Sequence, residues 1–185
     1  YCERDARMMN LLFLTCLFPL LSALLLAFSA GRWSEQRAAL IEVGSIGLSA
    51  LTALVLGVDF LGSVPTGGVF SQTLWQWMSI GSFQPALRLH LDGLSLTMLG
   101  VVTGVGFFIH LFASWYMRGE EGYSRFFAYT NLFIASMLFL ILGDNLLFIY
   151  FGWEGVGLCS YLLIGFYYSN RNNGNAALKA FIVTR

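Results

Sequence analysis

Charged residues are scarce in this sequence. Only 11% of its 185 residues are Asp, Glu, Lys or Arg, whereas 57% are hydrophobic. Soluble domains carry about 25% charged residues, so this chain lacks the polar surface that keeps a domain in water. We therefore predict an integral membrane protein.

An excess of positive charge is absent as well. Lys and Arg number 10 together, as do Asp and Glu, so the formal net charge is zero. Because nucleic-acid binding depends on basic surfaces that contact phosphates, the sequence argues against RNA or DNA as a partner.

Motifs for redox, hydrolytic or nucleotide chemistry are missing. The spacings of Cys2, Cys16 and Cys159 suit no metal site, and the last two lie in apolar runs where inert thiols are expected. No CxxC motif, heme-ligating histidine pair or Ser-His-Asp set is present. The glycines of "TGVGFF" follow no predicted strand, which argues against a nucleotide-binding loop. We expect no cofactor, metal or redox centre in this chain.

Long apolar runs dominate what is present. Five of them approach the length of about 20 residues that a membrane-spanning helix needs. In lipid each must satisfy its own backbone hydrogen bonds, so each is predicted to be helical. The fold class predicted is therefore an all-α, polytopic transmembrane bundle, with spans at 9–30, 38 to about 61, 94–116, 126–142 and 146–168.

A β-hairpin is predicted at 69–92, between the second and third spans. The stretch "LRLHLD" alternates strictly between apolar and polar residues, which is the period of a half-buried strand. Trp75 and Trp77 lie in the preceding "TLWQWM" and suit the aromatic belt at a membrane surface. We expect these two side chains to serve assembly and to lie away from any path through the membrane.

The two ends of the sequence differ from its middle. Met8 and Met9 are both candidate start residues. Residues 1–8, "YCERDARM", are therefore interpreted as a leader outside the natural fold. The tail "SNRNNGNAALKAFIVTR" begins as a polar loop, and helix-favouring residues follow from about Asn175. We interpret the last residues as a sixth helix that the sequence cuts short.

Arginines in the short loops predict the orientation. Loops after the first, third and fifth spans contain five arginines, and Lys179 lies just beyond the last of these loops. The opposite side has Arg88, with Arg4 and Arg7 in the leader. The positive-inside rule then places the first three loops in the cytoplasm and the N-terminus and hairpin outside.

Glu154 is the main candidate for chemistry. It lies near the middle of the apolar run "LLFIYFGWEGVGLCSYLLIGFYY", where a charge costs about 2.5–3.5 kcal/mol on insertion scales. Such a carboxyl can take up and release a proton, or it can be neutral and join helices by hydrogen bonds. Gly152, Gly155 and Gly157 leave room beside it for a neighbouring helix or for water.

Other ionisable residues in the spans have weaker cases. Lys179 is either a charge partner for a carboxyl or an interfacial lysine, and Arg185 would need a partner at membrane depth. His110 can relay protons, although a lone histidine is also a common packing residue. Glu42 and Asp59 lie towards the ends of the second span, where we expect solvation at the membrane surface.

The residues that follow Glu154 carry a resemblance to a known family. The chain from Met9 to Arg185 resembles the large antiporter-like subunit of bacterial respiratory complex I. That family is subunit L of NADH:quinone oxidoreductase and corresponds to chain 5 in mitochondria. The most specific part of the resemblance is "WEGVGLCSYLLIGF". Sister subunits and multisubunit sodium/proton antiporters share the glutamate but usually differ after it.

The resemblance implies a role in proton translocation. Glu154, Lys179 and Arg185 match family positions near the proton path, and the glutamate's lysine partner in the family lies beyond Arg185. Residues 9–125 would form the chain 5 N-terminal region, and 126–185 would begin the proton-conducting, antiporter-like domain. The family binds NADH, FMN, iron–sulfur clusters and quinone in other subunits of the complex, and its hairpin contacts a neighbouring antiporter-like subunit.

Three functions follow as hypotheses. The first is a proton-translocating subunit of NADH:quinone oxidoreductase in the bacterial inner membrane, surrounded by lipid and by the other membrane subunits. The second is a subunit of a multisubunit sodium/proton antiporter. The third is a structural membrane scaffold in which Glu154 only joins helices, and tolerance of Glu154→Gln would distinguish it.

Overall fold

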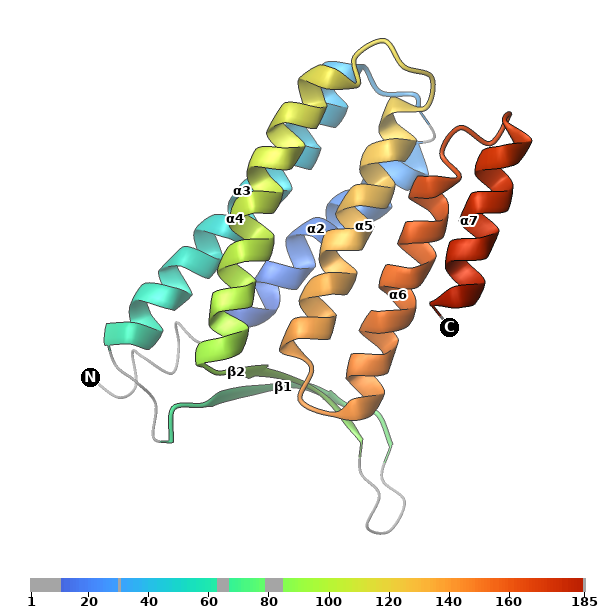
Figure 1. The fold of residues 1–185 in the computed structure, drawn as a ribbon. Helices are drawn as coiled ribbons and strands as arrows, with labels where there is room; N and C mark the ends of the chain where they lie inside the picture. Colours follow the sequence, from blue (N-terminus) through green and yellow to red (C-terminus); the bar gives the residue numbers. More distant parts are fainter. Residues whose placement is uncertain (1–10, 30, 63–66, 79–84, 185) are drawn as a thin grey trace.

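The predicted all-α architecture with one small hairpin is confirmed. The computed structural model describes residues 11–29, 31–62, 67–78 and 85–184. In this part of the chain, helices stand side by side and a two-stranded hairpin lies across one end of them (Figure 1). The elements are α2 (Leu12–Ser29), α3 (Glu35–Gly62), β1 (Phe70–Gln76), β2 (Ala86–Leu91), α4 (Gly93–Tyr116), α5 (Tyr123–Leu142), α6 (Leu146–Ile164) and α7 (Arg171–Val183).

Helices α2 to α6 are each long and apolar enough to cross a membrane. Large apolar side chains cover their outer surfaces; Phe28 and Leu146, for example, are both 82% exposed. In water such a surface would be unfavourable, but lipid solvates it. The chain is therefore a multi-pass membrane protein.

Successive connections between the helices lie at opposite ends of the bundle. At one end, Glu35 at the start of α3 accepts a hydrogen bond from the Gly119 amide (3.1 Å), and Arg125 donates to the Phe166 carbonyl (3.3 Å). We call this the loop end, because it gathers the α2–α3, α4–α5 and α6–α7 connections. The other end, called the hairpin end, holds the hairpin and the α5–α6 turn (Figure 1).

Four helices form a cluster that two more extend. Helix α2 packs against α3 and α5, and α4 also packs against α3 and α5. Helix α6 then packs against α5 on one side and α7 on the other. Helix α5 therefore separates the α2–α4 part of the bundle from α6 and α7.

The buried core consists of two apolar clusters at different depths. The hairpin-end cluster contains Leu12, Cys16, Ile46, Ala53, Leu56, Phe60, Leu89, Leu91, Leu99, Ile134, Leu138, Leu142 and Phe148. The loop-end cluster contains Leu26, Ala38, Met117, Tyr123, Phe127, Ala128 and Phe166.

The hairpin is bound to the bundle by backbone and side-chain hydrogen bonds. Its strands are antiparallel, and the alternation predicted for β2 is confirmed because Leu89 and Leu91 are fully buried. The Asn145 side-chain amide donates to the Ala86 carbonyl (2.7 Å), and the Asp144 amide donates to the Arg88 carbonyl (3.2 Å). The α5–α6 turn and β2 therefore form one contact.

Several helix boundaries differ from the prediction, two of them in the C-terminal helices α6 and α7. Helix α6 ends at Ile164 rather than at 168, and the chain then turns at Gly165. Helix α7 begins at Arg171 rather than near 175, because the Asn170 side chain accepts a hydrogen bond from the Asn172 amide (3.0 Å) and so provides an N-cap. The predicted leader, residues 1–8, lies outside the described residues.

Candidate functional site

Glu154 lies midway along α6. The helix begins after Asn145, whose side chain accepts a hydrogen bond from the Phe148 amide (2.9 Å) and caps the first turn. Glu154 is eight residues beyond Leu146, or about 12 Å along the axis at 1.5 Å per residue. The structure therefore places this carboxyl at the centre of a membrane-spanning helix, as the sequence predicts.

Two glycines beside Glu154 bring α6 close to α5. A Cβ atom at Gly152 would lie 2.6 Å from the Leu140 backbone nitrogen, and one at Gly155 would lie 2.6 Å from the Ser136 hydroxyl oxygen. Any larger residue would push the helices apart. Gly157 is different, because a Cβ there would meet nothing within 4 Å. The close approach thus depends on Gly152 and Gly155.

The Glu154 side chain is half-buried and lines an apolar groove of about 500 Å³ between the hairpin and α6. Trp75 and Trp77, which we expect to serve assembly, line this same groove. The reason is the docking of the hairpin against the α5–α6 turn. The lining is mostly aromatic and aliphatic: Leu74, Trp75, Trp77, Pro85, Ala86, Leu87, Phe139, Asn145, Leu147, Phe148, Tyr150, Phe151 and Glu154.

Helix α7 runs antiparallel to α6, and two contacts fix its register. The rings of Tyr161 and Phe181 are 5.4 Å apart, and the Trp153 indole N–H donates to the Thr184 carbonyl (3.3 Å). The end of α7, and not its beginning, is therefore level with Glu154. Arg185, the next residue of the chain, lies outside the described residues.

Lys179 is not level with Glu154. In the register set by the Tyr161 and Phe181 rings, Lys179 stands opposite Leu163, which is nine positions or about 13 Å from Glu154 along the axis. Its side chain is exposed and lies towards the loop end. Of the two interpretations of Lys179, this placement favours an interfacial lysine.

His110 belongs to a different part of the bundle. It is 4% exposed on α4, which packs against α3 and α5, whereas Glu154 is on α6. Its Nδ1 lies 2.8 Å from the Gly106 carbonyl oxygen. The structure therefore does not join His110 and Glu154 in one cluster.

Glu42 is the residue that the sequence reasoning missed. Solvation at the membrane surface was expected, but its side chain is fully buried at 0% exposure. The error has a physical cause: α3 begins at Glu35 rather than 38, so Glu42 lies two turns inside the helix. Its spacing from Ala38 and Ile46, both buried, is the periodic signal that could have identified it.

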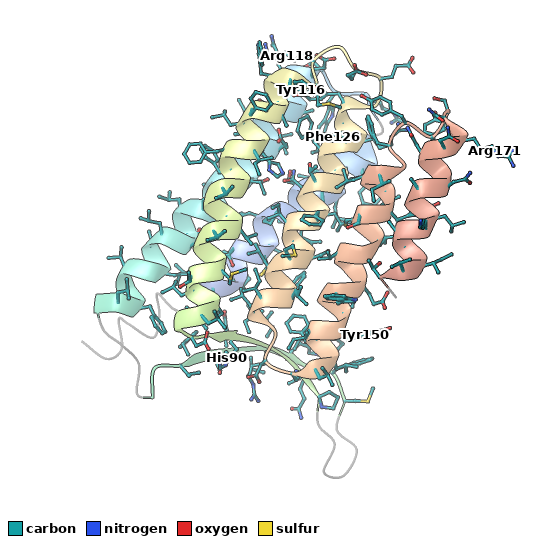
Figure 2. All side chains as sticks on the ribbon, in the orientation of Figure 1. His90, Tyr116, Arg118, Phe126, Tyr150 and Arg171 are labelled. Atoms are coloured by element: carbon teal, nitrogen blue, oxygen red, sulfur yellow. The ribbon has the colours of Figure 1, made fainter. Side chains whose placement is uncertain are left out.

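Charged residues at the hairpin end join the hairpin to the helices. Arg88 is 3.3 Å from Asp144, and His90 is 3.5 Å from the same carboxylate. Asp92 caps α4, and the hydrogen bond that its carboxylate accepts from the Ser95 amide lowers its pKa below the usual value. In Figure 2, His90 lies at this end, whereas Arg118 and Arg171 lie at the loop end.

Among the described residues, no group of three His, Cys, Asp or Glu side chains is arranged to hold a metal ion. The candidate site is therefore one carboxyl at membrane depth, with a tightly packed helix on one side and an apolar groove on the other. A group in such a place can change its proton occupancy when a nearby charge or water molecule arrives.

Comparisons with known proteins match two parts of the chain to family models. A model described as "NADH-Ubiquinone oxidoreductase (complex I), chain 5 N-terminus" matches residues 77–127. A second model, described as "NADH:quinone oxidoreductase/Mrp antiporter, TM", matches residues 143–185 and so includes Glu154 and Lys179.

Curated relatives agree with these matches. NADH-quinone oxidoreductase subunit L of Pseudomonas aeruginosa is 76% identical over 177 residues, which cover 96% of this chain and 29% of the relative. The subunit L of Escherichia coli is 66% identical over 96% of this chain and 28% of the relative. The subunit L of Rickettsia conorii is 35% identical over 95% of this chain and 26% of the relative. The chain thus spans under a third of the length of these relatives.

Proposed function

We propose, since the chain belongs to the subunit L family of NADH-quinone oxidoreductases, that it takes part in proton translocation coupled to NADH oxidation by quinone. The observation that carries the proposal is Glu154, a carboxyl at the middle of the membrane-spanning helix α6. A membrane-depth carboxyl is costly and serves ion or proton pathways by default.

In this proposal Glu154 holds and releases a proton. Its helix packs against the α5 backbone on one side, and the carboxyl lines the apolar groove on the other. Lys179 and Arg185 are assigned to the same relay as sources of positive charge, although Lys179 lies towards the loop end, about 13 Å from Glu154 along the axis. His110 is assigned a secondary place, because α5 lies between its helix and α6.

The complete activity is a property of the assembled complex. We assign NADH, FMN, iron–sulfur clusters and quinone to other subunits, and we assign to this chain only proton handling. Residues 9–125 would form the N-terminal region and 126–185 the start of the conducting domain. Its partners would be the other membrane subunits, especially a neighbouring antiporter-like subunit, and lipid, in a bacterial inner membrane with the N-terminus outside.

A second candidate is a subunit of a sodium/proton antiporter, because the description of the second matching family model names both kinds of protein. Inside-out vesicles that contain the full-length protein in its complex separate the two. Oxidation of NADH by quinone should drive proton uptake without added sodium. Proton movement that requires a sodium gradient and ignores NADH would instead support the antiporter.

A further inference from the structure

A polar layer divides the interior of the α2–α5 cluster. Between the hairpin-end cluster and the loop-end cluster, each of the four helices contributes a buried polar side chain. Their exposures are 2% for Ser22 on α2, 0% for Glu42 on α3, 4% for His110 on α4 and 0% for Asn131 on α5.

Contacts between the helices place these side chains at one depth. The Asn131 amide donates to the Ser22 hydroxyl (2.8 Å), and that hydroxyl is 3.5 Å from the Ile41 carbonyl, next to Glu42. On the other side, a Cβ at Gly47 would lie 3.1 Å from the Phe107 ring, which sets the register of α3 against α4.

In that antiparallel register Glu42 stands opposite residue 112 of α4, two positions from His110. The contact between α4 and α5 gives the same depth. A Cβ at Gly106 would lie 3.2 Å from the Ile134 side chain. His110 follows Gly106 by one turn and Asn131 precedes Ile134 by one turn, so both lie on the loop-end side of this contact. The buried stripes of both α3 and α4 include these residues, so Glu42 and His110 face the same interior.

Three members of the layer have buried atoms without a hydrogen-bond partner among the described residues. These atoms are both carboxyl oxygens of Glu42, Nε2 of His110 and Oδ1 of Asn131. Native proteins pair such atoms with each other, with a proton or with ordered water. Four orphan atoms at one depth therefore indicate a site that binds something small and polar.

The chemistry of His110 specifies what is bound. The Gly106 carbonyl can only accept, so His110 Nδ1 carries a hydrogen atom and donates it (2.8 Å). In a neutral imidazole, Nε2 is then an acceptor that faces the layer. A protonated Glu42 carboxyl can donate to Nε2 directly or through one water molecule, and transfer of that proton leaves a carboxylate and an imidazolium.

We propose that Glu42 and His110, with Ser22 and Asn131, form a proton-binding site inside the α2–α5 cluster, separate from Glu154. The site holds one proton that either residue can carry, and the Ser22 and Asn131 groups orient it or a bridging water. The net charge of the site stays the same when the proton moves between the two residues, because the transfer forms one carboxylate and one imidazolium.

A hollow at the loop end offers a route by which the site could exchange its proton with the solution. Its volume is about 610 Å³, and Glu35, Glu120 and Arg125 are among the residues that line it. Its lining also includes Leu26 and Ala128, which are four positions from Ser22 and three from Asn131 along their helices. The remaining gap is about 5–6 Å at 1.5 Å per residue.

Few other charges face the layer. On α5, Tyr129 lies two positions from Asn131, and the Tyr123 hydroxyl donates to the Ser114 carbonyl (2.8 Å). Helix α2 offers only hydroxyls at this depth. Glu35, at the start of α3, and Arg118, after α4, lie two turns towards the loop end. The Arg125 guanidinium faces away, over the Phe166 ring at 5.0 Å.

Infrared difference spectroscopy of the full-length protein in its lipid-reconstituted complex tests the proposal. A carboxylic-acid carbonyl band should titrate with pH, disappear in Glu42→Gln and persist in the control Asp59→Asn, which changes a carboxyl at the other end of α3. In His110→Asn the midpoint of that band should move to higher pH by about one unit, because the carboxylate loses its cationic partner.

Several outcomes would overturn the proposal. Identical spectra for the parent and Glu42→Gln between pH 4 and about pH 11 would show that Glu42 does not titrate. An unchanged midpoint in His110→Asn would show that the two residues share no proton. A midpoint that follows sodium concentration at constant pH would show a sodium site instead. None of these readouts depends on the role of Glu154.

Discussion

At the scale of single residues, the packing of α6 on α5 gives a sharp test. Gly152→Ala should destabilise the protein by about 1–3 kcal/mol, since its Cβ would lie 2.6 Å from the Leu140 backbone. Gly157→Ala, in the same helix with open space around it, should be neutral or slightly stabilising. Thermal unfolding of the two purified variants measures the difference, and equal melting temperatures would contradict the close approach.

The cap of α4 should give a pH-dependent contribution to stability. The hydrogen bond from the Ser95 amide lowers the folded-state pKa of Asp92 below its usual value of 3.8, so the stabilisation is full above that value. It is lost as pH falls through the lowered pKa, where the folded carboxylate is protonated.

We therefore expect Asp92→Ala to lower the melting temperature at neutral pH, by an amount that corresponds to about 0.5–2 kcal/mol. The gap between the parent and Asp92→Ala should narrow as the pH falls below 3.8. Asp92→Asn, which keeps an acceptor oxygen, is the matched control and should lose less at neutral pH. A gap that stays constant over this pH range would exclude the cap as its cause.

Single residues also mark the limit of prediction from sequence. Glu154 was predicted at the centre of its helix, because the long apolar run around it shows both ends of the span. The burial of Glu42 was not predicted, since it depends on three helices that meet at its depth. The spacing of Glu42 from Ala38 and Ile46 was the available signal, but a helical stripe does not show which neighbours cover it.

At the scale of elements, the hairpin should depend more on Asn145 than on Arg88. Asn145 caps α6 and also donates to the Ala86 carbonyl, so Asn145→Ala removes two hydrogen bonds. Arg88 makes a partly exposed ion pair with Asp144, and such pairs contribute about 0–1 kcal/mol.

The amount of assembled complex and its melting temperature should therefore fall further in Asn145→Ala than in Arg88→Ala. Hydrogen exchange of the β2 amides, compared between the two variants, shows whether the hairpin loosens. Equal protection of β2 in both variants and in the parent would contradict the proposed anchor.

Elements were largely predictable because hydrophobicity determines them. Strict alternation in "LRLHLD" predicted β2, and length with composition predicted the five spans. What could not be predicted was the position of the hairpin, which lies close enough to α6 for Trp75, Trp77 and Glu154 to line one groove. That arrangement depends on hydrogen bonds between the α5–α6 turn and β2, which no local pattern reveals.

At the scale of the whole molecule, the structure separates a loop end from a hairpin end, and the arginines are unevenly divided between them. We expect the loop end to be cytoplasmic, because Arg118, Arg125 and Arg171 lie there. In intact cells, a cysteine in Glu121→Cys should resist an impermeant thiol reagent. One in Ser71→Cys, on exposed β1 at the hairpin end, should react readily.

The native thiols Cys16 and Cys159 are buried and should give little background, and Cys2 is replaced by serine in both variants and in the parent. Labelling of both introduced cysteines after membrane permeabilisation is the control for accessibility. Reaction at Glu121→Cys and protection at Ser71→Cys in intact cells would reverse the orientation.

The central claim is that Glu154 carries a proton, and the number of protons translocated per NADH oxidised tests it most directly. A central charge costs a helix about 2.5–3.5 kcal/mol, whereas a glutamine of nearly equal shape could pack there more cheaply. In vesicles with the full-length protein and equal amounts of complex, Glu154→Gln should lower this ratio strongly or stop coupled turnover. Glu154→Asp, which keeps the ionisable group on a shorter side chain, should retain part of the activity. A Glu154→Gln variant that translocates protons as well as the parent would contradict the account and leave Glu154 as a packing residue.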